Sequence, residues 1–175
     1  MKLFTVLLIV VASLKAAPAQ KPRPEIQAPE VEARIHGLIN GERGLKRVAP
    51  LPLDEKLSAI ARKHSEDMAT RRYFKHADPE GKGPRARLDA AGYKCETRMG
   101  ENIFLNNLYS GVETKGKRTI YDWNSLEDIA TSTVLAWMNS DDHRDNILQV
   151  EYDRTGIGVA LGADDKVYIT EMFCR

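Results

Sequence analysis

One short run of residues, NSDDHRDNIL from Asn139 to Leu148, combines a histidine with the signals that start a helix. Ser140 is a good N-cap residue, and Asp141 and Asp142 would occupy the first turn, where acidic side chains suit the positive end of the helix dipole. His143 follows directly. A neutral imidazole at this position can ligate a metal ion or act as a general base. The competing interpretation is an ordinary polar residue in a well-capped turn.

Three other segments carry side chains that can meet His143. YFKHADPEG presents His76 at the end of a predicted helix, MGENI presents Glu101 after a glycine, and YITEMF presents Glu171 within a predicted strand. None of these segments has a short metal-binding spacing such as H-E-x-x-H, so local spacing does not establish a metal site. His64 lies in the apolar stripe of a helix, where we expect a core histidine.

The helices that position these residues are predicted from the spacing of apolar side chains. Val31, Ile35 and Ile39 share one face, and Gly44 is a plausible stop for that helix. Ser125, three residues before Asp128, forms an approximate capping box at the start of another helix. Helices are therefore predicted from about residue 31 to Gly44, within 51–74, around 85–91 and within 125–140.

The C-terminal residues alternate like strands on both sides of a turn at Gly162 to Asp165, which predicts a hairpin. Gly156 and Gly158 share one face of its first strand and indicate close packing there. The expected fold class is therefore α+β, with helices packed on a small antiparallel sheet. Residues 105–124 show no clear period and are interpreted as a surface insertion.

The N-terminal segment predicts export. Residues 1–19 contain a lysine, an apolar core and the small-x-small site Ala17-Pro18-Ala19, which is the layout of a secretory signal peptide; an uncleaved anchor is the alternative. The proline-bearing residues 20–30 are expected to be a linker. Residues 31–175 then form one domain, secreted or periplasmic, and the mature chain is expected to have no transmembrane segment.

Charge and cysteine content narrow the possibilities further. The 26 basic and 25 acidic side chains give a net charge of +1, so we expect no nucleic-acid partner. In an exported protein the two cysteines, Cys95 and Cys174, are expected to form a disulfide, the alternative being two free buried thiols.

Five segments, taken in order, resemble the CAP superfamily of cysteine-rich secretory proteins, antigen-5 allergens and plant pathogenesis-related proteins. The similarity is closest to the prokaryotic SCP-like branch, with its W-x-x-S-x-x-H-R-x-N-I-L run, and covers about Glu32 to Phe173. It implies a three-layer α/β/α sandwich with a central antiparallel sheet, the CAP/SCP fold. The matching segments are YFKHADPEG, GENI, WMNSDDHRDNIL, YDRTGIGVA and VYITEMF.

The resemblance also implies a cavity that carries two histidines and two glutamates, in which the histidines of some members hold zinc or another divalent metal. Matched by motif, the expected metal ligands here are His76, His143 and Glu101, and Glu101 is the candidate catalytic residue. The second glutamate would lie three residues after Trp137, where this chain has Ser140. A hydroxyl cannot supply a carboxylate's charge, which argues against a mechanism that needs two carboxylates.

Other residues near this cavity are expected to have structural roles. We expect Arg144 and Asn146 to anchor a turn, and the insertion at 105–124 to lie near the cavity edge. A basic cluster around His76 is interpreted as a solvated face; its members are Arg71, Arg72, Lys75, Lys82, Arg85 and Arg87.

The favoured function is a non-enzymatic extracellular module that binds a lipid, glycan or protein partner and has a metal-holding His/Glu cavity. The alternative is a zinc-dependent hydrolase acting on cell-envelope or extracellular polymers, in which zinc activates a water molecule. A third interpretation makes His76, Glu101 and His143 a buried polar network that clamps the helices together.

Overall fold

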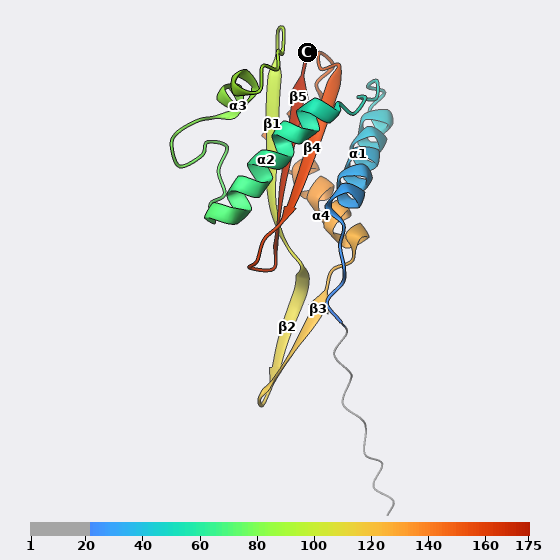
Figure 1. Ribbon diagram of the computed structural model, residues 1–175. Helices are drawn as coiled ribbons and strands as arrows, with labels where there is room; N and C mark the ends of the chain where they lie inside the picture. Colours follow the sequence, from blue (N-terminus) through green and yellow to red (C-terminus); the bar gives the residue numbers. More distant parts are fainter. Residues whose placement is uncertain (1–21) are drawn as a thin grey trace, which may run out of the picture.

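The computed structural model describes residues 22–175; the predicted signal peptide, residues 1–19, lies outside the described residues. Within the described part the chain runs α1 (Ala28–Leu45), α2 (Glu55–Arg71), α3 (Pro84–Ala90), β1 (Met99–Asn107), β2 (Tyr109–Lys115), β3 (Arg118–Trp123), α4 (Leu126–Met138), α5 (Asp141–Leu148), β4 (Arg154–Leu161) and β5 (Lys166–Cys174) (Figure 1).

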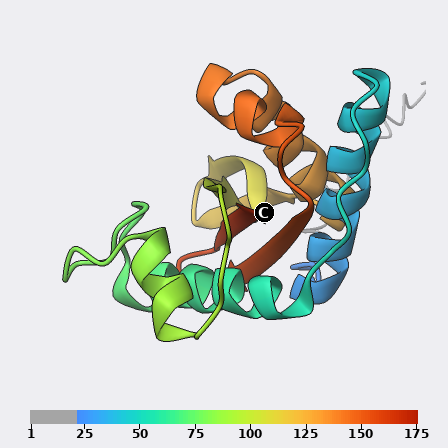
Figure 2. The same cartoon turned by 90° about the horizontal axis from the view of Figure 1, so that it is seen from above.

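A three-stranded antiparallel sheet of order β1-β5-β4 lies between two layers of helices (Figure 2). On one face, Leu57 and Ile60 of α2 and Leu88 of α3 share a core cluster with Met172 of β5. On the other face, buried side chains of α1, α4 and α5 share the main core with β4 and β5. The predicted α/β/α sandwich and the C-terminal hairpin β4–β5 are therefore confirmed.

Helices α2 and α4 begin where the sequence places a capping side chain. Asp54 Oδ1 accepts a hydrogen bond from the backbone N–H of Leu57 at 2.9 Å, which starts α2. Arg72, in the left-handed conformation, ends it. Ser125 and Asp128 form the full reciprocal capping box at the start of α4, as their spacing predicts.

Glycines of β4 let α2 approach the sheet closely. A Cβ atom on Gly158 would lie 2.0 Å from the backbone nitrogen of Arg62, and one on Gly156 would lie 2.4 Å from the backbone nitrogen of Ser58. Both positions therefore exclude a side chain. The prediction that these glycines serve packing is confirmed, and α2 is the element that they admit.

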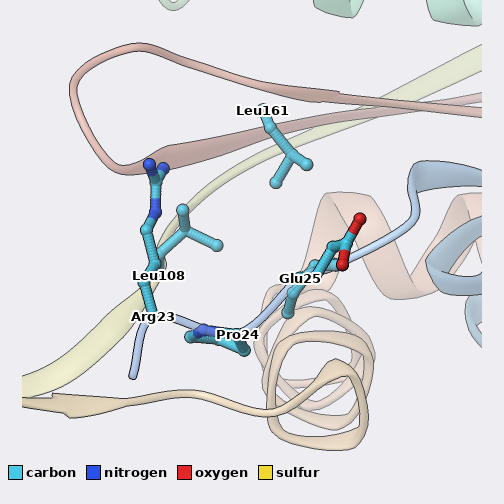
Figure 3. Close-up of a pocket in the computed structure, with 6 residues that line it drawn as sticks. Arg23, Pro24, Glu25, Leu108 and Leu161 are labelled. Atoms are coloured by element: carbon cyan, nitrogen blue, oxygen red, sulfur yellow. The ribbon is translucent and has the colours of Figure 1, made fainter. Parts of the chain in front are cut away.

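The segment before α1 lies against the domain rather than apart from it. Ile26 is buried in the main core, and the Arg23 guanidinium pairs with Asp165 in the β4–β5 turn at 2.7 Å. Figure 3 shows Arg23, Leu108 and Leu161 around a hollow whose volume is about 370 Å³ and which Ile26 also lines. Part of the segment expected to be a linker, residues 20–30, is thus structured, and α1 begins at Ala28.

A disulfide joins Cys95 to Cys174, so the predicted pairing is confirmed and the end of β5 is tied to the segment before β1. Residues 105–124, interpreted as a surface insertion without a clear period, contain β2 and β3, which form a largely exposed hairpin that extends away from the main sheet (Figure 1). No helix within residues 22–175 is both long and apolar enough to span a bilayer.

Candidate functional site

Glu101 is the centre of a polar cluster at the β1 edge of the sheet. Its side chain is 2 % exposed, and one carboxylate oxygen lies 2.8 Å from His76 Nδ1. The other oxygen accepts a hydrogen bond from Arg87 Nη2. A carboxylate only accepts hydrogen bonds, so Nδ1 of His76 carries the proton and its Nε2 is left for another partner. We call His76, Arg87 and Glu101 the Glu101 cluster.

The loop after α2 places His76 beside Glu101. Asp78 Oδ1 accepts hydrogen bonds from the backbone nitrogens of Glu80 at 3.0 Å and Lys82 at 2.8 Å, which closes the turn. Arg87 of α3 also donates to the carbonyl oxygen of His76 at 2.9 Å. His76 is therefore fixed through its backbone, while its side chain stays 52 % exposed.

α5 carries His143 to the same edge from the other face of β1. Asn102 donates to the carbonyl oxygen of His143 at 3.1 Å, and Asn146 donates to Asn102 Oδ1 at 2.9 Å. A Cβ atom on Gly100 would lie 2.7 Å from Asn146 Oδ1, so only glycine admits this contact. Glu101 thus contacts the loop with His76 on one side of β1, and Gly100 and Asn102 contact α5 on the other side.

The electrostatic environment favours a neutral His143. Burial lowers its pKa, the nearby charge of His76 lowers it further, and Asp142 opposes both with a smaller effect. The sequence left open whether the helix start or the aspartates would prevail; in the structure burial and His76 outweigh Asp142, so the pKa of His143 is lowered. The influence of His76 also places the two histidines within electrostatic range of each other.

His64 lies in the core, as predicted, yet close to the Glu101 cluster. It is 2 % exposed, and its Nε2 has no hydrogen-bond partner among the described residues. Burial lowers its pKa to about 4, with a further lowering from the positive charge of Arg87. This imidazole is therefore neutral near pH 7, and it is a buried, uncharged neighbour of Arg87 and Glu101.

Two other sequence candidates lie elsewhere. Glu171 pairs with Asn102 and Ile157 across the sheet and is completely buried, with Thr155 Oγ1 donating to it at 3.0 Å. Burial raises its pKa to about 8. Ser140 occupies the N-cap position of α5, but its side chain makes no capping hydrogen bond, so that part of the prediction is wrong.

Arg87 and Asn102 are the residues that sequence reasoning missed. Arg87 was assigned to a solvated basic face, whereas its side chain is 14 % exposed and bonded to Glu101. Asn102 could have been found from the sequence, because it follows Glu101 directly in the GENI motif. Arg144 and Asn146 are confirmed as anchors: Arg144 donates to the carbonyl oxygen of Met138 at 3.1 Å.

The contacts of Glu101 limit which side chains near it are free to ligate a metal ion. Within residues 22–175 no group of three His, Cys, Asp or Glu side chains is arranged to hold a metal ion. Glu101 is occupied by His76 and Arg87, which leaves imidazole nitrogens as the available donors.

Comparisons with known proteins agree with this fold. A model of the cysteine-rich secretory protein family (CAP) matches residues 36–173. An uncharacterized protein of Bacillus subtilis, YkwD, is 33 % identical over 151 residues, which are 84 % of this chain and 51 % of YkwD. The chain thus spans about half the length of this relative.

Solved structures show the same fold. An extracellular SCP-domain protein of Bacillus anthracis has a TM-score of 0.64 at 24 % identity, over 85 % of this chain and 41 % of that one. An outer surface protein of Borrelia burgdorferi has a TM-score of 0.66 at 16 % identity, over 86 % and 96 %. NaASP2, solved with Zn²⁺, has a TM-score of 0.50 at 13 % identity, over 82 % and 78 %.

Proposed function

The chain belongs to the cysteine-rich secretory protein (CAP) family, and we propose that it is an exported, non-enzymatic binding module whose His76 and His143 hold a divalent metal such as zinc. The lipid, glycan or protein partner expected of such a module would meet the β1 edge, where these two side chains lie. Two structural relatives, an extracellular SCP-domain protein and an outer surface protein, support export.

One observation supports the metal proposal above the others: the 2.8 Å contact between His76 Nδ1 and Glu101. Metal-ligating histidines usually donate their second ring N–H to a carboxylate, which fixes the tautomer and makes the other nitrogen a better ligand. Glu101 is buried and Arg87 holds it in place. His76 therefore presents Nε2 outward from an exposed side chain, ready to coordinate.

His143 fits the same role. A ligating imidazole must be neutral, and burial lowers the pKa of His143. Two imidazoles with water in the remaining positions make a weak zinc site compared with the four-ligand sites that stabilise whole domains. Bound zinc would supply a Lewis acid and a recognition point for an oxygen-bearing partner.

The binding role is favoured over hydrolysis by the state of Glu101. A general base needs a free oxygen within reach of the attacking water. Both oxygens of Glu101 are engaged, by His76 and Arg87. Ser140 stands where the family's second carboxylate would be. A zinc-dependent hydrolase acting on envelope polymers remains the alternative, and its signature would be turnover that Glu101→Gln abolishes.

Calorimetric titration of the purified protein with zinc tests the proposal. We expect saturable binding that is lost in His76→Ala and in His143→Ala. Glu101→Gln should weaken binding by roughly 10- to 100-fold, as expected for an outer-shell partner. His36→Gln is the matched control, because His36 hydrogen-bonds to Leu51 and Asn40 away from the cluster.

Urea unfolding of the same variants separates binding from a purely structural clamp. The proposal predicts that His76→Ala folds with a midpoint close to that of the parent, since this side chain is half exposed. Unchanged zinc affinity in both histidine variants would contradict the proposal. Unfolding of both variants would favour the clamp instead.

A further inference from the structure

A hollow lies between α2 and α3 and borders the Glu101 cluster at Arg87. Its volume is about 920 Å³, near the upper end of the usual range for small-molecule sites, about 300–1,000 Å³. The two helices run along the same face of the sheet (Figures 1 and 2). We call this hollow the α2–α3 groove, and its lining includes Lys56, Ile60, Lys63, Arg87, Tyr93 and Lys94.

The floor of the groove is apolar and formed by small side chains. Ala59 and Ile60 of α2 face Ala90 and Ala91 at the end of α3, and the ring of Tyr93 closes one side. Ile60 is only 7 % exposed, so it lies in the floor of the groove rather than at its rim. Such a surface accepts an aliphatic or aromatic body, because burying it removes apolar area from water.

The rim of the groove is cationic. Lys56, Lys63 and Lys94 line it, are exposed, and make no ion pair with any described residue. The one carboxylate in the lining, Asp54, is already occupied, since it accepts hydrogen bonds from Tyr93 Oη at 2.7 Å and from the backbone of α2. Its negative charge remains, but the three lysines of the lining outnumber it.

Two guanidinium groups, which pair with Asp153 and Glu101, also line the groove. Arg154 donates to Tyr93 Oη at 2.9 Å and its guanidinium lies over the Tyr93 ring at 5.9 Å from the centroid. Arg87, which bonds to Glu101, lines the groove as well. Fixed guanidinium groups recognise carboxylate and phosphate oxygens better than flexible lysines do. The groove thus adjoins the Glu101 cluster through Arg87.

We propose that the α2–α3 groove binds an amphiphilic organic anion: a single dissolved molecule whose carboxylate, phosphate or sulfonate group meets the cationic rim and whose apolar body lies on the floor between Ile60 and Tyr93. Apolar burial supplies affinity, and the lysines supply selectivity for negative charge. This site is separate from the metal proposal, since none of its lining residues is His76, His143 or Glu101.

Fluorescence titration with 1-anilinonaphthalene-8-sulfonate, an anionic apolar probe, tests the proposal on the folded protein. We expect saturable binding in the micromolar range that weakens as salt is added. N-phenyl-1-naphthylamine, which has a similar ring system and no charge, should bind at least tenfold more weakly. Inorganic phosphate alone should compete poorly, because it lacks the apolar body.

Two kinds of variant locate the site. Lys63→Glu combined with Lys94→Glu reverses the rim charge at exposed positions and should weaken the anionic probe at least tenfold, with little effect on the neutral one. Ala59→Trp fills the floor and should weaken both probes. Lys115→Glu and Lys166→Glu, on the hairpins, are matched controls that should leave both affinities unchanged; circular dichroism checks that each variant is folded.

Equal affinity for the anionic probe in the rim variant and the parent would overturn the proposal. So would equal affinity of the parent for both probes. A membrane-docking face is the remaining outcome: sedimentation with phosphatidylglycerol-containing vesicles, without saturable binding of the dissolved probe, would also overturn it. Zinc affinity should be the same in the rim variant and the parent, so failure here leaves the metal proposal separately testable.

Discussion

Replacing Gly158 by alanine tests the packing that positions the site. The added Cβ would lie 2.0 Å from the backbone nitrogen of Arg62 and 2.3 Å from the carbonyl carbon of Ala61. Ordinary contact at such positions begins near 3.4 Å, so α2 must retreat by more than an ångström along this part of its length. Backbone atoms cannot rotate away as a flexible side chain does.

The size of the effect follows from this geometry. Overpacking a well-packed core costs about 1–3 kcal/mol, and we expect Gly158→Ala to reach the upper end of that range because the clash involves helix backbone. A displaced α2 would also move the chain that leads to His76, so zinc affinity should fall together with stability.

Urea unfolding, followed by far-ultraviolet circular dichroism, measures the change in the free energy of unfolding. Gly111→Ala is the matched control: it is also a glycine in a strand, but its added Cβ would meet only Asp122 Cβ at 3.8 Å, an ordinary contact. The control should change stability by less than about 1 kcal/mol. Equal unfolding midpoints for the two variants would refute the packing described here.

Two further predictions concern buried groups on β5. Breaking the disulfide, by reduction or by replacing Cys95 and Cys174 with serine, should lower the free energy of unfolding by about 4–5 kcal/mol, because the two cysteines are 79 residues apart; an unchanged urea midpoint under reducing conditions would contradict this. Burial raises the pKa of Glu171 to about 8, so folding favours its protonated form and stability is lost as pH rises from about 4.5 through 8. Glu171→Gln should remove that loss and stabilise the protein at pH 8 but not at pH 4, by a few kcal/mol, since a tenfold change in proton affinity is worth about 1.4 kcal/mol. Parallel pH–stability curves for Glu171→Gln and the parent would show that the carboxyl is not buried as described.

Patterns within a few residues of sequence were enough to predict the helices α2 and α4. The stripe of apolar residues in α2 and the capping box at Ser125 lie within a few residues of each other, and both helices form as expected. The strand β1 is not predicted by a local pattern, because its burial follows no simple alternation. Its register depends on pairing with β5, as in Glu101 opposite Met172, and such distant pairing cannot be seen in a window of sequence.

The β2–β3 hairpin was missed for a related reason. A register shift between Tyr109 and Gly111 interrupts the alternation that marks a strand, and the turn depends on Gly116 with φ of +62°. Neither feature gives a strong signal by itself. The aromatic rings of Tyr121 and Trp123, stacked at 4.9 Å, show how the hairpin is stabilised once it has formed.

The site was predicted in part. Motif resemblance gave His76, Glu101 and His143, and the structure brings the first two into contact. The role of Arg87 could not be predicted, because its acidic neighbours along the chain suggested a solvated face while its real partner lies on β1. The facing of Glu171 was equally hidden, since polar Thr170 precedes it and apolar Met172 follows it in the sequence.

The most direct test of the central claim is anomalous diffraction at the zinc absorption edge, from crystals of the protein grown with zinc. The account predicts a zinc peak bonded to Nε2 of His76 and to a ring nitrogen of His143, with His76 Nδ1 still donating to Glu101 and Arg87 still on the other carboxylate oxygen. A peak ligated by Glu101 without His76, or a fully occupied zinc elsewhere with none between the two histidines, would contradict it.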